Sequence, residues 1–403
     1  MTESTTASSG NALLDGERAI ELSVVIPCLN EADTLGLCLE KANRALAEHQ
    51  IVGEVIVADN GSSDGSPEVA ERYGARVIHV SRRGYGSALM AGFREARGKY
   101  VIMGDADDSY DFLEIPKFVD KLREGYDLVQ GCRFPSGGGR IMPGAMPALH
   151  RWWGNPMFSK LARWWFKAPI NDVYCGLRGF TRSHAVQLDQ WSLGMEFAVE
   201  MVIKSSLHGA SIAEVPITLH PDKRQGRLPH LRTFRDGWRT LRFFLMYSPR
   251  MLFVIPGMAL VLLGVIGYAL AMPGVTIGPM TFDAHTLLFA SLFLISGYQS
   301  ILFGTLTKAY ALGQGLLPSD TSSERFRRHF NLERGLFLGG LTMLAGIALL
   351  AVAVNEWRLV DFGALYYSNT MRWVVPGVTL STLGFQTVLW SFGLSILLMR
   401  RPS

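Results

Sequence analysis

The sequence has 403 residues, enough for two domains, and 48% of them are hydrophobic, which is high for a wholly soluble protein. The modest net charge of +4, with no long basic run, argues against nucleic acid as a partner. The four cysteines, Cys28, Cys38, Cys132 and Cys175, form no CxxC pair, which argues against a zinc site and fits a reducing compartment.

Residues 1–18 are rich in Ser, Thr and small polar residues and lack the apolar core of a signal peptide. We expect a disordered tail there. A regular alternation of strand and helix patterns follows. Short apolar, β-branched runs predict strands at Leu22–Ile26, Glu54–Ala58, Ala75–His79 and Tyr100–Met103. The stretches between them predict helices at Ala32–Glu48, Ser66–Tyr73 and Ser87–Ala96.

This alternation predicts an α/β domain over residues 19–230, with a mostly parallel sheet flanked by helices. Ligands bind such sheets at the carboxyl ends of the strands, and the polar clusters of this sequence fall there. Pro27, Asn30 and Glu31 follow the first strand, and a polar run opens at Asp59 and Asn60 after the second. These side chains suit a ribose or the edge of a base, although ordinary turn chemistry explains either loop alone.

A glycine-rich segment with Gly84, Tyr85 and Gly86 opens the third predicted helix, directly after Arg82 and Arg83. Backbone N–H groups at a helix N-terminus, together with two arginines, favour a diphosphate. The segment is not a dinucleotide-binding fingerprint, because no GxGxxG follows the first strand.

The fourth strand leads into three carboxylates within four positions, Asp105, Asp107 and Asp108. Like charges this close repel one another unless a cation lies among them. Hard divalent ions such as Mg²⁺ or Mn²⁺ prefer oxygen ligands and bridge carboxylates to substrate phosphates. A solvated acidic turn is the alternative.

Two later segments are basic and aromatic. Residues 151–167 interleave four tryptophans with Arg151 and three other basic residues and contain no acid. From Lys223 to Arg250 there are eight basic residues and one acid, and residues 231–250 predict a basic interfacial helix. Both segments suit an anionic lipid interface, where they would anchor the domain, capture a substrate, or do both.

The rest of the chain, residues 251–403, predicts a transmembrane domain. Four uncharged stretches, at about 251–271, 284–307, 335–354 and 375–399, are long enough to cross roughly 30 Å of hydrocarbon. The basic residues of the loops are Lys308, Arg325, Arg327, Arg328 and Arg334 between the second and third spans, and Arg400 and Arg401 after the fourth. They predict an integral protein of the cell (inner) membrane with the α/β domain and both termini in the cytoplasm. A homo-oligomer would explain four spans, although no motif indicates one.

The polar loops carry a resemblance to a known family. The residues that carry the resemblance are Pro27 with Asn30 and Glu31, the run Asp59–Gly65, and Asp105 with Asp107. The order and spacing of these loops resemble family 2 glycosyltransferases with the Rossmann-like GT-A fold. Within them the sequence is similar to the dolichyl-phosphate mannose and polyprenyl-phosphate glucose synthase group. Three further blocks, Arg151–Pro156, Cys175–Phe180 and Gly194–Met201, are similar to the dolichol-phosphate-glucose-synthetase-like branch, and the resemblance covers about residues 20–250.

The resemblance implies a hexosyltransferase that moves a sugar from a nucleotide sugar to polyprenyl or dolichyl phosphate, in a metal-assisted inverting displacement. It implies catalytic and metal-binding roles for Asp105 and Asp107. The residues expected at the donor are Pro27, Asn30, Glu31, Asp59, Asn60, Gly84, Tyr85 and Gly86. Those expected at the acceptor phosphate are Arg133, Arg151 and Asn155. Branch resemblance favours UDP-glucose as donor, followed by GDP-mannose and UDP-N-acetylglucosamine.

Two positions depart from the family pattern. Asn60 replaces the more usual second Asp, and Ser109 stands where relatives often have Gln or an acid. The third protein ligand of the metal therefore stays open, with Asp108 and Asp111 as candidates.

No general base is required, because a phosphate monoester is already ionised near neutral pH. We therefore expect Glu196 and Glu200, at helical spacing, to support the site by orienting Arg178 or other residues. A processive polysaccharide synthase is the first alternative, but no QxxRW segment is present. An inactive membrane scaffold is the second, and the intact Asp105 and Asp107 argue against it.

Overall fold

The computed structural model describes residues 19–223, 233–314, 317 and 332–399. Several predicted features lie outside these ranges. They are the tail, part of the interfacial helix, and the arginines Arg325, Arg327, Arg328, Arg400 and Arg401. Contacts divide the chain into two units, Met1–Gly237 and Trp238–Ser403, and each is described by itself.

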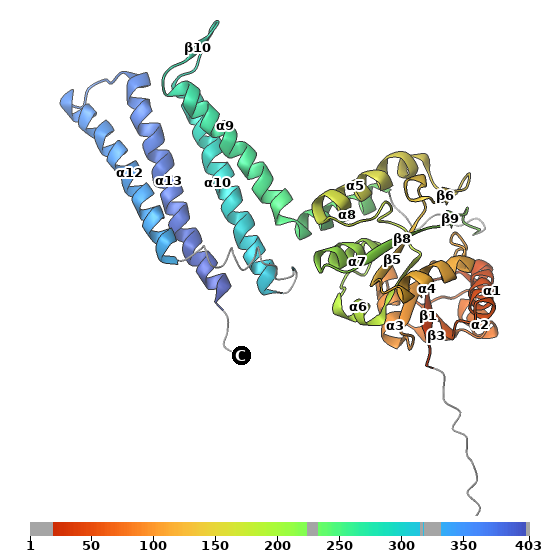
Figure 1. Cartoon of the computed structure of the whole chain (residues 1–403). Coiled ribbons are helices and arrows are strands. Elements are labelled where there is room, and N and C mark those ends of the chain that lie inside the picture. The colour runs from red at the N-terminus through yellow and green to blue at the C-terminus, as the bar shows by residue number, and fades with distance from the viewer. Residues whose placement is uncertain (1–18, 224–232, 315–316, 318–331, 400–403) are drawn as a thin grey trace, which may run out of the picture. The chain divides into compact units, whose positions relative to one another are not determined.

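The first unit is built on one mixed sheet (Figure 1). Its strands are β1 (Leu22–Cys28), β2 (Gly53–Asp59), β3 (Arg76–His79), β4 (Tyr100–Met103), β5 (Leu128–Cys132), β7 (Arg178–Thr181) and β8 (Ile212–Pro216). Their order is β3-β2-β1-β4-β7-β5-β8. The predicted parallel pairing holds from β3 to β4, but β7 runs antiparallel to both of its neighbours. A small second sheet pairs β6 (Arg140–Ile141) with β9 (Thr218–Leu219).

Helices cover both faces of this sheet. They are α1 (Ala32–Glu48), α2 (Ser66–Arg72), α3 (Tyr85–Glu95), α4 (Ile115–Arg123), α5 (Asn155–Phe166), α6 (Arg182–Gln187) and α7 (Glu196–Leu207). Single turns lie at η1 (Phe112–Glu114), η2 (Pro135–Gly137) and η3 (His150–Gly154).

The alternation of side chains along β1 shows how the two faces are filled. Val24 and Ile26 join the buried cluster that includes Leu35 of α1. Val25 faces α3, where a Cβ on Gly92 would lie 2.3 Å from Val25 Cγ1. Both faces of a central strand are thus buried, as its unbroken apolar sequence predicts. Since β1, β2 and β4 are parallel, their carboxyl ends meet at one edge, and the predicted polar loops start there.

Several element boundaries differ by one or two residues from the sequence prediction, and three of them lie next to the polar loops. Strand β1 continues through Pro27 to Cys28, and β2 includes Asp59, so these residues lie within paired strands. Helix α3 starts at Tyr85, two residues before the predicted start. Ladder pairing and tertiary packing extend elements past the point where local sequence preference ends.

The second unit contains four helices long and apolar enough to cross a membrane, at Arg250–Ala271, Ala284–Gly313, Leu332–Leu359 and Tyr367–Leu398. They comprise η4 (Arg250–Val254) with α9 (Ile255–Ala271), and α10, α12 and α13 over the other three ranges. A short hairpin, β10 (Thr276–Ile277) and β11 (Met280–Thr281), joins α9 to α10. Helix α8 (Thr233–Tyr247) precedes them, and its Phe234, Trp238 and Arg239 are exposed.

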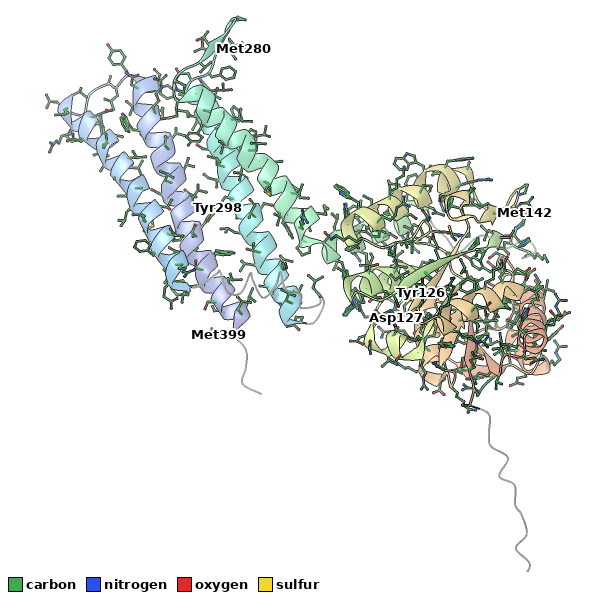
Figure 2. All side chains as sticks on the ribbon, in the orientation of Figure 1. Tyr126, Asp127, Met142, Met280, Tyr298 and Met399 are labelled. Carbon is green, nitrogen blue, oxygen red and sulfur yellow. The ribbon has the colours of Figure 1, made fainter. Side chains whose placement is uncertain are left out.

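Glycines and hydroxyl groups hold these four helices together. Helix α10 packs against α9 and α13, and α13 packs against α12. A Cβ on Gly346 of α12 would lie 2.7 Å from the carbonyl oxygen of Gly377 of α13, so only glycine permits that approach. The hydroxyl of Tyr298 of α10, labelled in Figure 2, lies 2.6 Å from that of Thr387 of α13. Such bonds stabilise helix pairs where water offers no alternative partner.

Candidate active site

The loops after β1 and β2 interlock through side chains that were predicted at the donor. Asn30 has a left-handed backbone, with φ 58°. Its N–H donates to Ser62 Oγ at 2.9 Å, and its Oδ1 accepts from the N–H of Ser63 at 2.8 Å. The N–H of Glu31 donates to Ser66 Oγ at 2.9 Å. The structure therefore brings Asn30 and Glu31 beside the 59–65 loop.

Asp59 ends β2 with an ordered, buried carboxylate. Its Oδ1 accepts from the N–H of Ser62 at 3.0 Å, and its Oδ2 accepts from the N–H of Gly61 at 3.2 Å. Nδ1 of His79, at the end of β3, lies 3.4 Å from Oδ2. Burial alone would raise the pKa of Asp59, but hydrogen bonds from Ser62, His79 and Gly61 outweigh it and lower the pKa below its usual value. Asp59 is therefore an ionised acceptor near neutral pH.

Asn60, which departs from the family pattern, organises the neighbouring loop. Its Nδ2 donates to the carbonyl oxygens of Val80 at 3.2 Å and Arg82 at 2.9 Å, and its Oδ1 accepts from the N–H of Gly84 at 2.7 Å. A carboxylate has no N–H with which to replace the first two bonds. The amide thus fixes residues 80–84, a role that sequence reasoning missed.

The glycines of the 82–86 segment serve close packing. The N–H of Gly86 donates to the carbonyl oxygen of Leu193 at 2.9 Å, and a Cβ on Gly84 would lie 2.4 Å from that oxygen. The expectation was that these backbone N–H groups face a diphosphate, but those of Gly84 and Gly86 donate within the protein. The exposed side chains of Arg82 and Arg83 are better placed to meet one.

The loop after β4 holds two oriented carboxylates. The hydroxyl of Tyr85 donates to Asp105 Oδ1 at 2.9 Å, and burial and the Asp105 charge raise the pKa of Tyr85 well above its usual value, so the phenol keeps its proton. Asp107 Oδ1 accepts from the N–H of Ser109 at 3.0 Å and from its Oγ at 2.6 Å. A Cβ on Gly176 would lie 2.7 Å from Asp105 Oδ2, so a larger residue there would displace this carboxylate.

The two candidates for a third metal ligand are engaged elsewhere. Asp108 pairs with Lys41 at 2.7 Å and with Lys223 at 2.6 Å, and Asp111 Oδ1 accepts from the N–H of Leu113 at the start of η1. Within the described ranges, no set of three or more carboxylate, imidazole or thiol groups is arranged to hold a metal. The oxygens of Asp105 and Asp107 still suit Mg²⁺ or Mn²⁺, which keep water and substrate phosphates as further ligands.

Arg133, expected at the acceptor, is instead an internal structural group. Its Nε and Nη2 donate to the two carboxylate oxygens of Asp172 at 2.6 and 2.8 Å, and its Nη1 lies 3.4 Å from the hydroxyl of Tyr110. Both side chains of the pair are buried. A bidentate, buried ion pair leaves this charge poorly placed to bind a second anion.

Arg151 has a different environment. It lies in η3, its guanidinium stacks at 5.2 Å over the ring of the exposed Trp152, and it has no carboxylate partner in the part of the chain that the structure describes. Asn155 opens α5, and its Nδ2 lies 3.5 Å from Met146 Sδ. Of the two arginines predicted at the acceptor, Arg151 is therefore the better placed to bind an anion.

The predicted supporting residues contact different partners from those expected. Arg178 is fully buried and donates to the carbonyl oxygens of Cys175 and Ala198, both at 2.5 Å. Glu200 pairs with Lys204 at 2.9 Å and accepts from the N–H of Ser192 at 2.9 Å, so it holds the segment that packs on Gly84 and Gly86.

Glu196 lies beside Gly194, where a Cβ would meet Glu196 Oε2 at 2.5 Å. Neither glutamate bonds to Arg178 in the described structure. The expectation named Arg178 or other residues of the site, and Glu200 contacts the second kind, since it holds the segment that packs on Gly84 and Gly86. Carbonyl oxygens hold that guanidinium because α7 and the turn before β7 converge on it.

A mixed α/β sheet with ordered carboxylates at the ends of β2 and β4, followed by apolar helices, is the arrangement expected of a GT-A glycosyltransferase domain with a C-terminal transmembrane region. Residues 23–187 match the model of glycosyl transferase family 2, and residues 305–398 match that of the glycosyltransferase family 2 C-terminal transmembrane region. The chain belongs to glycosyltransferase family 2 and is an integral membrane enzyme.

Three relatives show how far the similarity extends. The low-salt glycan biosynthesis hexosyltransferase Agl6 of Haloferax volcanii is 39% identical over 95% of this chain and 91% of its own. A dolichyl-phosphate hexose transferase of the same organism is 34% identical over 49% of this chain and 82% of its own. The undecaprenyl-phosphate 4-deoxy-4-formamido-L-arabinose transferase of Klebsiella pneumoniae is 30% identical over 71% and 86%.

Replacing Asn60 with Asp should loosen the 80–84 loop, because two donated hydrogen bonds are lost and a carboxylate then faces two carbonyl oxygens. At about 1 kcal/mol for each bond, amide exchange in residues 80–84 should rise roughly tenfold or more. Hydrogen–deuterium exchange with mass spectrometry measures this. Asn43→Asp, at an exposed amide 3.0 Å from the carbonyl of Tyr73, is the matched control. Unchanged exchange in the 80–84 segment would contradict the role given to Asn60.

Proposed function

We propose that this enzyme transfers a hexose from a nucleotide sugar to a polyprenyl phosphate, whose ionised phosphate attacks directly with inversion. One observation carries the proposal: a single chain joins the Asp105 and Asp107 site to four apolar helices, as expected if the acceptor is a lipid. The names of the Haloferax and Klebsiella relatives, with their dolichyl- and undecaprenyl-phosphate acceptors, support it. The catalytic domain and both termini lie in the cytoplasm under this proposal, in accord with the basic loops.

The contacts of the site fit chemistry without a general base. The phosphate brings its own negative charge, so the protein must position it and stabilise the leaving nucleoside diphosphate. Glu200 is fully buried and paired with Lys204, so its carboxylate is not accessible to an acceptor. Asp105 and Asp107 would hold Mg²⁺ or Mn²⁺, which neutralises charge on the departing diphosphate.

The acceptor phosphate is assigned to Arg151. The surface around it has large aromatic side chains that are rarely so exposed on a water-facing surface, since Trp152 is 75% exposed and Trp164 is 68% exposed. Tryptophans favour the headgroup region of a bilayer, where a lipid phosphate also lies. Among the residues that the structure describes, Arg151 is therefore a cation without a carboxylate partner, and the aromatic side chains around it suit the interface. Arg133 keeps a structural role in this proposal.

The nucleobase of the donor is assigned from the hydrogen bonds that the Asp59 carboxylate can still accept. A carboxylate oxygen accepts about two hydrogen bonds. Oδ2 already meets the N–H of Gly61 and His79 Nδ1, Oδ1 meets the N–H of Ser62, and the Ser62 side chain also bonds to this carboxylate. A carboxylate with this many donors around it suits the single imide N–H of uracil better than the two adjacent N–H donors of guanine. UDP-glucose is therefore our first donor, ahead of UDP-N-acetylglucosamine and GDP-mannose.

Asp107→Asn should lower transfer by on the order of 100-fold or more, because an anionic ligand of the metal and diphosphate is lost. Membranes containing the protein are incubated with labelled UDP-glucose, UDP-N-acetylglucosamine or GDP-mannose and polyprenyl phosphate. We expect one glycolipid that extracts into organic solvent. Asp33→Asn, at an exposed position in the first turn of α1, is the control and should retain activity. A long water-soluble polymer, or full activity in Asp107→Asn, would refute the proposal.

His79→Ala should weaken the preference for uridine, because it vacates an acceptor position on Asp59. One hydrogen bond of about 1 kcal/mol predicts a roughly fivefold fall in the ratio of UDP to GDP affinity. Inhibition constants of the two nucleotides against the wild type and the variant measure this ratio. His49→Ala, at the exposed end of α1, should leave it unchanged. A wild type that binds GDP more tightly than UDP would remove the basis for this donor assignment.

Arg151→Ala should raise the apparent KM for polyprenyl phosphate about tenfold, since a charge-assisted contact to phosphate contributes about 1.5–3 kcal/mol. The KM for the nucleotide sugar should change little. Arg182→Ala, an exposed arginine at the start of α6, is the control. Equal changes in both KM values would show that Arg151 acts on the fold of the site and not on the acceptor.

A further inference from the structure

Asp108 is the third acid after β4, and its contacts differ from those expected of a metal ligand. Only 1% of its side chain is exposed, and its backbone adopts the left-handed region with φ 57°. Oδ1 lies 2.7 Å from Lys41 Nζ, and Oδ2 lies 2.6 Å from Lys223 Nζ. Each oxygen thus has its own lysine. A buried carboxylate would be very costly without such partners.

The two lysines approach the loop from separate parts of the chain. Lys41 belongs to α1, which also places Cys38 Sγ 3.9 Å from the carbonyl oxygen of Asp105. Lys223 follows β9, and its own N–H donates to the carbonyl oxygen of Asp107 at 3.4 Å. Three residues earlier, the N–H of His220 donates to the carbonyl oxygen of Ser109 at 2.9 Å. The loop after β4 is therefore fixed from two directions.

These contacts also reduce the repulsion within the loop. Lys41 lies 3.6 Å from Asp111 as well, so its charge is shared between two acids. Two ammonium groups thereby offset part of the negative charge that Asp105 and Asp107 would otherwise experience from their neighbours. Asp105 and Asp107 can then stay close enough to share one cation.

We propose that Lys41 and Lys223, acting through Asp108, are positioning residues that hold Asp105 and Asp107 in the geometry required by a divalent cation and a nucleoside diphosphate. The inference rests on the metal-binding role proposed for that loop and is independent of the acceptor lipid. Lys41 should matter more, because 18% of its side chain is exposed, against 55% for Lys223. Water screens the more exposed pair more strongly.

The test is Mn²⁺ binding to the full-length protein in detergent, in the presence of UDP and, in parallel, GDP. Electron paramagnetic resonance of free Mn²⁺ gives the Kd without turnover. Asp108→Asn and Lys41→Met should weaken Mn²⁺ binding about tenfold, the lower end of the range for groups that orient metal ligands. Lys223→Met should weaken it by a smaller factor, and Lys41→Arg should retain most of the affinity.

Lys117→Met is the matched control, since Lys117 pairs with Glu114 on the surface and its side chain is 54% exposed. Circular dichroism confirms the fold of each variant, and the lysine variants carry the test if Asp108→Asn does not fold. Wild-type affinity in folded Lys41→Met, or an equal loss in Lys117→Met, would overturn the proposal. Wild-type protein that binds no Mn²⁺ with either nucleotide would overturn this proposal and the metal assignment together. A wild type that binds Mn²⁺ but does not glycosylate polyprenyl phosphate would refute only the acceptor.

Discussion

Repulsion among acidic side chains after β4 is the constraint on which the site depends. Asp105, Asp107, Asp108 and Asp111 lie within seven positions. Two unit charges 4 Å apart repel by about 4 kcal/mol at an effective dielectric constant near 20. That is a large share of the roughly 5–15 kcal/mol that stabilises a typical domain. Such a loop can be ordered only if each acid has its own partner.

Some of these acids accept hydrogen bonds from hydroxyl groups, and another pairs with lysines. Tyr85 and Ser109 donate neutral hydrogen bonds to Asp105 and Asp107. Asp108 is neutralised by lysines on both of its oxygens. Under the metal-binding role proposed above, the same four-residue sequence contains two ligands, Asp105 and Asp107, and one anchor, Asp108.

The sequence was sufficient to predict features that depend on local pattern. Alternating strands and helices located β1, β2 and β4, and parallel pairing placed Asp59, Asp105 and Asp107 at one edge. It did not predict β7, because an antiparallel insertion depends on how the chain returns to the sheet.

Features that join distant residues were also missed. Lys41 and Asp108 are 67 positions apart, and Arg133 and Asp172 are 39 apart. A family pattern marks such residues as important but does not show what they contact. Asn60 illustrates this, since its three bonds to residues 80–84 identify a structural amide where the pattern showed only an unusual residue.

The two arginines proposed from the sequence for the acceptor show how burial separates structure from function. A lipid phosphate must find a cation that is accessible and uncompensated. Arg133 is neither accessible nor uncompensated, because its guanidinium is buried and donates two hydrogen bonds to the carboxylate of Asp172. Removing Arg133 would leave a buried carboxylate unpaired, so loss of activity in such a variant would report on folding. Arg151 stacks on an exposed tryptophan and can change its contacts at little cost to the fold. Of these two arginines, Arg151 therefore allows the cleaner test of acceptor binding.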